Sequence, residues 1–195
     1  MSLADVPAGH LAAVVTCLEM RLPPAPLPAT ESALTLDQVT LAPEAYRNLF
    51  RAVGGPWLWF SRLIISDADL GAILDRPEVT LYEVRDGHRV VGMLELDRRL
   101  AGECELSFVG LIPSYAGKGH GRWLLDEAVR RAWEGAERIH VHTCSLDHPA
   151  ALAAYLRAGF TATGRKVEIF SDPRLVGILS RDAAPQVPLI DRGPD

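Results

Sequence analysis

A glycine-rich turn between an apolar strand and an amphipathic helix constrains this chain more than any other feature. Residues 111–125 read LIPSYAGKGHGRWLL, with glycine at 117, 119 and 121. Glycines let a backbone approach a phosphate closely, and the unpaired N–H groups at a helix N-terminus attract anions. The stretch therefore predicts a phosphate-binding turn, with backbone donors from Gly117 to Arg122.

The spacing within the turn also excludes common phosphate ligands. Gly-x-Gly-x-Gly lacks the last interval of a dinucleotide fingerprint, and no Gly-Lys-Ser or Gly-Lys-Thr pair marks a Walker loop. Neither NAD nor ATP is the expected ligand.

A second segment identifies the class of cofactor. Residues 147–160 read DHPAALAAYLRAGF, and together with the glycine turn they resemble the GNAT superfamily of acyl-CoA-dependent N-acyltransferases. The resemblance implies that the turn holds the CoA pyrophosphate and that acetyl-CoA is the cosubstrate. The cofactor-binding residues that it implies are Val109, Leu111, Gly117, Lys118, Gly119, His120, Gly121, Arg122 and His148.

Two motif positions depart from the family pattern. Ala116 stands where the family has Arg or Gln, and His148 stands where it often has Asn. Because the backbone donors of the turn remain, we expect weaker CoA binding rather than its loss. The well-matched region is about residues 77–165, and its matching positions in the second motif are Tyr155, Gly159 and Phe160.

Composition fits one globular domain over residues 1–195. The chain is 48% hydrophobic and 23% charged, and its 20 basic against 25 acidic residues offer no footprint for nucleic acid or an anionic membrane. The first apolar run is short and carries no basic segment before it, and three cysteines show no disulfide spacing. We therefore expect a cytoplasmic protein.

Periodicity and turn signals predict an α/β (α+β) chain. The order of its elements resembles the GNAT fold, and this resemblance implies a mixed, largely antiparallel central sheet of about seven strands with helices on both faces. A loose tail is predicted for residues 183–195. Predicted strands cover 11–22, 33–41, 79–84, 90–96, 103–111 and 139–144, with a closing hairpin of 160–163 and 167–170. Predicted helices cover 43–53, 57–65, 66–74, 119–134 and 149–158.

Acyl transfer to an amine requires a base for the amine proton. Glu105 lies fourteen residues before Gly119, where the resemblance places the general base of some family members, and Glu103 is on the same strand face. Alternation would place Leu106, Phe108 and Gly110 on the opposite face. The alternative, which stays open, is that both carboxylates face solvent in cross-strand pairs.

Tyr155 matches the tyrosine that the resemblance places near the CoA sulfur, where a phenol can protonate the leaving thiolate. A tyrosine that merely packs the helix against the sheet is the alternative. For the oxyanion, the resemblance implies a backbone N–H of Leu111 or a neighbour.

His140, His142 and Cys144 share one strand face, with Asp147 and His148 beyond, so a zinc site has to be considered. Alternate strand residues favour two ligands rather than four, and the GNAT resemblance requires no metal. We therefore expect no metal.

Aromatic residues crowd the segment that borders the acceptor site in the GNAT fold. Trp57 and Trp59 follow a Gly-Gly-Pro bend and are predicted to contact the acceptor together with Glu103; the alternative is that they belong to the core. The expected activity is direct transfer of an acetyl group from acetyl-CoA to a primary amine of a small molecule or peptide. The alternative is a catalytically weak acyl-CoA-binding regulatory domain, and the family also makes a homodimer a candidate state.

Overall fold

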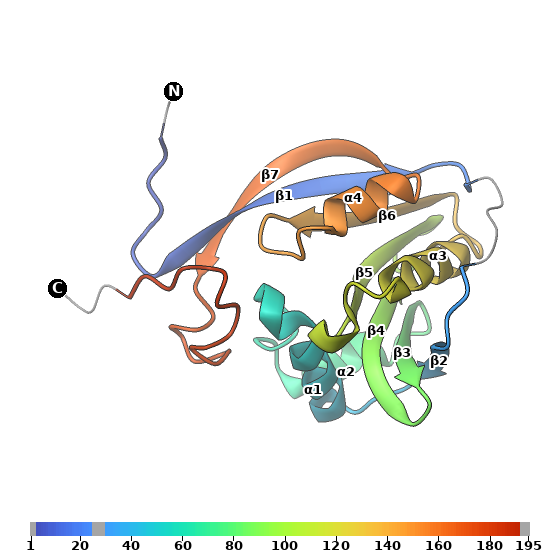
Figure 1. Cartoon of the computed structure of the whole chain (residues 1–195), viewed down its shortest axis with the longest axis horizontal. Helices are drawn as coiled ribbons and strands as arrows, with labels where there is room; N and C mark the ends of the chain where they lie inside the picture. The colour runs from blue at the N-terminus through green and yellow to red at the C-terminus, as the bar shows by residue number, and fades with distance from the viewer. Residues whose placement is uncertain (1–2, 25–29, 192–195) are drawn as a thin grey trace.

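The computed structural model describes residues 3–24 and 30–191, which form one seven-stranded sheet in the order β2-β3-β4-β5-β6-β1-β7 (Figure 1). Every neighbouring pair is antiparallel except β5 and β6. This arrangement confirms the predicted mixed sheet. The strands are β1 His10–Met20, β2 Thr35–Val39, β3 Val79–Asp86, β4 Arg89–Asp97, β5 Glu103–Leu111, β6 Arg138–Cys144 and β7 Thr161–Ser171.

The parallel strands β5 and β6 stay paired only at their first residues. Their register ends at Glu105 opposite His140, although both strands continue. Beyond that pair the sheet divides into two arms, β2 to β5 and β6-β1-β7, which spread apart in Figure 1. The unpaired strand edges at this split position the site.

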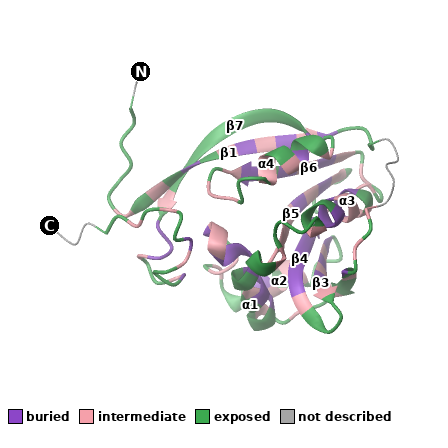
Figure 2. Cartoon of the chain, in the orientation of Figure 1, coloured by how far each residue is buried: buried purple, intermediate pink, exposed green. Residues whose placement is uncertain are grey.

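The N-terminal strand β1 lies between β6 and β7, far from the strands that follow it in sequence. The predicted hairpin of 160–163 and 167–170 is therefore wrong: Thr161–Ser171 is one continuous strand that pairs with β1. β1 supplies hydrogen-bond partners along the whole of β7, so the chain continues as a strand through Gly164 instead of turning there. Figure 2 shows β7 exposed along most of its length.

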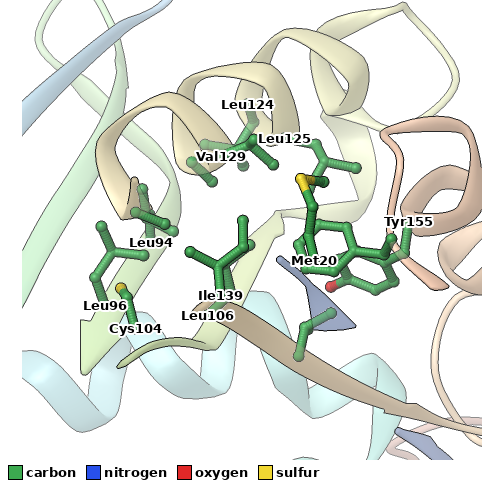
Figure 3. Close-up of a cluster of buried hydrophobic side chains, with 14 of the residues drawn as sticks. Met20, Leu94, Leu96, Cys104, Leu106, Leu124, Leu125, Val129, Ile139 and Tyr155 are labelled. Atoms are coloured by element: carbon green, nitrogen blue, oxygen red, sulfur yellow. The ribbon is translucent and has the colours of Figure 1, made fainter. Parts of the chain in front are cut away.

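Helices cover both faces of the sheet. Adjacent residues of β4 point to opposite sides, with Leu94 packed in the cluster of α3 and α4 and Met93 in that of α1. Figure 3 shows the first cluster, with Tyr155 of α4 within it. The helices are α1 Pro43–Gly54, α2 Asp67–Leu74, α3 His120–Ala132 and α4 Ala151–Arg157, with short 3-10 turns η1 Gly55–Trp57 and η2 Pro113–Tyr115.

The predicted helix over 57–65 is also wrong. The segment contains no α-helix, and its only helical part is the end of the 3-10 turn η1. Leu58 ends that turn: it donates its N–H to the Gly55 carbonyl and adopts a left-handed conformation (φ 58°). Its side chains are fixed individually instead. Trp59 packs on Phe50 of α1 and on Phe108 of β5, with ring centroids 5.6 and 5.3 Å apart.

The predicted alternation of side chains along β5 is partly wrong, because the strand contains a β-bulge. Glu95 of β4 faces Phe108, but the next residue, Leu96, faces Leu106, so Ser107 is the extra residue. Beyond it the faces exchange: Phe108 joins the α1 cluster, and Gly110 faces Val53. Phe108 and Gly110 thus share the face of Glu105, whereas Leu106 lies opposite it as predicted.

After β7 the chain folds back and packs against the η1 turn and Leu58. Arg174, 3% exposed, binds Asp172 and donates to the carbonyls of Ala183, Ala184, Val187 and Pro188. Leu179 and Ala184 then pack on Leu58. Looseness of residues 183–195 stays a prediction, and residues 192–195 lie outside the described part of the chain.

Candidate active site

A cavity of about 510 Å³ lies at the split between β5 and β6. It passes through the sheet, because its wall includes Val141, which faces α3 and α4, and also His142, which alternates to the opposite face. The glycine turn, the start of α3, the helix α4, the segment 57–61 and β7 complete the wall. A ligand held on the α3 face can thus meet another that enters from the face of α1.

The glycine turn forms one end of this cavity. Gly117 and Gly119 have φ values of +76° and +84°, which favour glycine, and Gly119 caps α3 with no side-chain hydrogen bond. The first N–H groups of α3 are therefore left without a side-chain cap. A Cβ added at Gly117, Gly119 or Gly121 would meet nothing within 4 Å, so the turn has room for a pyrophosphate against its backbone.

Tyr155 lies in the wall of the cavity on the α3 and α4 side. Its side chain is 9% exposed, and its ring packs edge-on against Phe160 at 5.8 Å. Burial raises the pKa of the phenol, and the nearby negative charge of Asp147 raises it further. Tyr155 therefore keeps its proton at neutral pH and can act as an acid.

Asp147, just after β6, connects the end of that strand to the segment 57–61 through hydrogen bonds. One carboxylate oxygen accepts the indole N–H of Trp59 (3.0 Å), and the other accepts the Thr143 hydroxyl (2.7 Å) and the Cys144 N–H (2.8 Å). Trp57 packs edge-on against His148 at 5.0 Å. Both predicted acceptor tryptophans thus line the cavity and link its two walls.

The two predicted strand carboxylates lie apart from the main cavity. Glu105 borders a smaller pocket together with Asp97, Arg99 and His140, and it approaches the main cavity only through His142, whose Nδ1 lies 3.4 Å from Glu105 Oε1. Glu103 is held by Arg138 (2.7 Å). Its predicted contact with the acceptor stays a prediction.

The predicted cofactor residues divide into two groups. Lys118 and His120 do not line the main cavity and instead lie near the Tyr115 ring, at 5.3 and 6.0 Å from its centroid. Their contact with the cofactor stays a prediction. Those that do line the cavity are Val109, Leu111, Gly117, Gly119, Gly121, Arg122 and His148.

Comparison with known proteins agrees with this geometry. The family model "Acetyltransferase (GNAT) family" matches residues 44–160, which run from α1 through the glycine turn to the end of α4. The chain belongs to the GNAT acetyltransferase family. The sequence resemblance and the expected acyltransferase class are confirmed, whereas β1 and β7 lie outside the matched region.

Individual relatives are distant. N-alpha-acetyltransferase RimI of Mycobacterium tuberculosis (strain ATCC 25618 / H37Rv) is 33% identical over 141 residues, 70% of this chain and 81% of that protein. A GCN5-related N-acetyltransferase from Sphaerobacter thermophilus superimposes with a TM-score of 0.56 at 21% identity, over 83% of this chain. The match spans 53% of that chain, about half its length. An acetyltransferase from Thermus thermophilus superimposes with a TM-score of 0.51 at 20% identity, over 70% of this chain and 97% of that chain.

The departures from the GNAT motifs have local structural explanations. Ala116 ends the turn η2 and lines the cavity with a methyl group where the family pattern has a long polar side chain. His148 accepts the Ala150 N–H on its Nδ1 (3.1 Å), so it orders the start of α4. That bond requires the ring to carry its proton on Nε2 when it is neutral.

The histidines of β6 do not gather as metal ligands. Among the described residues, no group of three or more His, Cys, Asp or Glu side chains is placed to hold a metal ion. His140 instead lies 3.5 Å from Glu103, and His142 contacts Glu105. Over the same residues, no helix combines the length and apolar character needed to cross a membrane.

Sequence reasoning missed part of the cavity wall. Glu168 and Phe170 of β7 line the cavity, and His142 lines it as well, although the sequence suggested only a metal role for that histidine. Polar and apolar residues alternate in part of β7, which indicated a strand. The sequence could not show which of these side chains face the cavity, because that depends on the pairing of β7 with β1.

Proposed function

We propose that the protein transfers an acetyl group from acetyl-CoA directly to a primary amine while both substrates are bound. The observation that carries this proposal is the cavity that begins at the glycine turn and passes Tyr155 at the split between β5 and β6. Its lining residues come from both faces of the sheet, which supports a donor on one face and an acceptor on the other. When bound, acetyl-CoA supplies the activated thioester.

The part of the cavity proposed to hold acetyl-CoA is formed by backbone groups and two cationic side chains. The turn from Gly117 to Gly121 offers N–H groups to the pyrophosphate, and Arg122 and Arg157 in the same wall add positive charge. Val109 and Leu111 follow the point where β5 loses β6 as a partner. Their outward backbone groups are therefore available to the donor and to an oxyanion.

Tyr155 is proposed as the acid that protonates the leaving thiolate. Its reference pKa exceeds that of a thiol, and burial raises it further. Removal of the amine proton is assigned to Glu105 and the groups that it contacts, on the opposite face of the sheet.

The acceptor half is aromatic and acidic. Trp57, Trp59 and Phe170 line it, with Glu168 and Asp147 as its carboxylates. Such a wall suits an amine that arrives as a cation. The similarity to an N-alpha-acetyltransferase supports the α-amine of a polypeptide as the acceptor.

The test is calorimetric titration of acetyl-CoA into the purified protein, followed by thiol release with a panel of peptides and small amines. We expect binding, and release that depends on one acceptor class. Tyr155→Phe should keep binding and lower turnover by about a hundredfold or more, whereas the control Tyr82→Phe should change neither. Binding without release from any amine, or release unaffected by Tyr155→Phe, would contradict the proposal.

A further inference from the structure

His142, and not the glutamate behind it, is the titratable group of this pair that reaches the main cavity. His142 lines that cavity, whereas Glu105 borders the smaller pocket. His142 directs Nδ1 toward Glu105 Oε1 at 3.4 Å. Its other nitrogen, Nε2, makes no hydrogen bond or ion pair with the residues that the structure describes, which leaves it for a ligand.

The position of His142 in the sheet suits proton transfer between the two substrates. It follows His140, the last residue of β6 that pairs with β5, by two positions on the same strand face. It therefore stands just beyond the point where the strands separate. Tyr155 lines the same cavity from the α3 and α4 side.

The charged groups that shift the pKa of His142 come from neighbouring elements and are carboxylates. Glu105 contacts it from β5, while Asp147 after β6 and Glu168 of β7 act at longer range. On β1 the residue opposite it is Cys17, and an ordinary thiol carries no charge at neutral pH. The Glu105 contact, followed by the other two carboxylates, raises the pKa of His142 despite partial burial.

We propose that His142 is the catalytic base of the acetyl transfer and that Glu105 is a positioning residue that orients the imidazole. This assignment rests on the function proposed above. The neutral amine nitrogen bonds to the thioester carbon and gives one proton to His142 Nε2. The C–S bond then breaks, the sulfur takes a proton from Tyr155, and water returns the proton of His142 to the phenolate.

The assignment also selects an acceptor class. A polypeptide α-amine has a reference pKa of about 7.7–8.0, close to that of an imidazole, whereas a lysine amine has one of about 10.4. Because the step begins from the neutral amine, the first amine is far more often in its reactive form at neutral pH than the second, and a histidine is too weak a base to deprotonate the second efficiently. We therefore expect a peptide with a free α-amine and no lysine to react at least about tenfold faster than the same peptide with a blocked N-terminus and one lysine.

The experiment measures kcat/KM against pH with these two peptides and, separately, the pKa of His142 by NMR without substrate. In the unaltered protein, activity should rise with pH as His142 loses its proton. Glu105→Gln should lower the pKa of His142 and move this acid limb to lower pH. His142→Gln should lower kcat about a hundredfold or more and abolish the acid limb, with acetyl-CoA affinity unchanged. The control His140→Gln should keep both kcat and the acid limb.

Two results would overturn the assignment. One is an unchanged acid limb in His142→Gln together with its loss in Glu105→Gln, which would make the carboxylate itself the base. The other is an NMR pKa of His142 that does not respond to Glu105→Gln. An unaltered protein that binds no acetyl-CoA or acetylates no amine would refute the proposed function itself, and the assignment with it.

Discussion

The indole Nε1 of Trp59 donates a 3.0 Å hydrogen bond to Asp147 Oδ1, although the two residues are 88 positions apart in the sequence. The bond joins the loop after α1, beside the first arm, to the end of β6, in the second arm. The width of the cavity at its acceptor end is therefore set by this contact and by the packing of Trp57 on His148.

Trp59→Phe should destabilise the protein by about 1–2 kcal/mol, because it removes a donor to a carboxylate while keeping an aromatic ring in place. It should also raise KM for the amine. Denaturant unfolding and steady-state kinetics check both effects. The control is Trp133→Phe: Trp133 Nε1 is buried with no partner among the described residues, so its loss should cost little. Equal effects of the two substitutions would contradict the role of the bond.

Gly121→Ala should separate stability from cofactor binding. Alanine favours a helix over glycine by about 0.5–1 kcal/mol, and a Cβ at Gly121 would meet no atom within 4 Å. The free energy of unfolding should therefore increase. The methyl group would project into the cavity beside the turn, so acetyl-CoA affinity should fall by about tenfold, or about 1.4 kcal/mol.

Gly71→Ala in α2 is the matched control for this change. Its Cβ would make only an ordinary 4.0 Å contact with Pro43, far from the glycine turn in sequence. It should increase stability and leave affinity unchanged, as thermal unfolding and calorimetry can show. Undiminished affinity in Gly121→Ala would mean that the donor does not lie against this turn.

Glu95→Gln should destabilise the protein by about 3 kcal/mol. Glu95 is fully buried and accepts the Tyr46 hydroxyl (2.5 Å) and Arg62 Nη2 (2.6 Å), so its loss leaves a largely buried guanidinium without a counterion. Urea unfolding measures the cost. Glu83→Gln removes one of two acidic partners of the more exposed Arg85, which keeps Asp37, so it should cost less than about 1 kcal/mol. A similar cost for both would be evidence against the buried ion pair.

Asp172→Asn should destabilise the protein in a pH-dependent way. Burial acts to raise the pKa of Asp172, but hydrogen bonds from Arg174 outweigh it and lower the pKa. A carboxylate with a lowered folded pKa stabilises fully above its unfolded value of about 3.9, and the effect is lost as pH falls through the folded value. The difference in unfolding free energy should therefore be largest above about pH 5 and shrink in acid.

The exposed pair of Arg181 and Asp191 provides the control for that titration. Asp191→Asn should give a small difference with little dependence on pH. A difference for Asp172→Asn that stays constant from pH 3 to pH 6 would contradict the proposed linkage.

The sequence was sufficient to predict most of the strands and the glycine turn, because local signals mark them, while the resemblance to the GNAT family supplied the mixed sheet. Period-2 and period-3.6 patterns mark the elements, and the αL glycines Gly117 and Gly119 mark the turn. The match to the family confirms the fold and the enzyme class. Individual roles in binding and catalysis stay predictions.

The errors arose where distant segments decide the local structure. Thr161–Ser171 is one strand because β1 pairs with it, and residues 57–65 are not a helix because Trp59 is fixed by Phe50, Phe108 and Asp147. The bulge at Ser107 likewise depends on β4. His142 could not be linked to Glu105 from sequence, because that contact needs the register of β5 with β6.

The place of β1 has a consequence for synthesis on the ribosome. The strand is translated before both of its neighbours in the sheet, which begin only at Arg138 and Thr161. Until those residues emerge, both edges of β1 stay unpaired, so nascent chains expose a strand that can pair wrongly. The wall of the cavity that carries His142 is thus completed only after β7 has been translated.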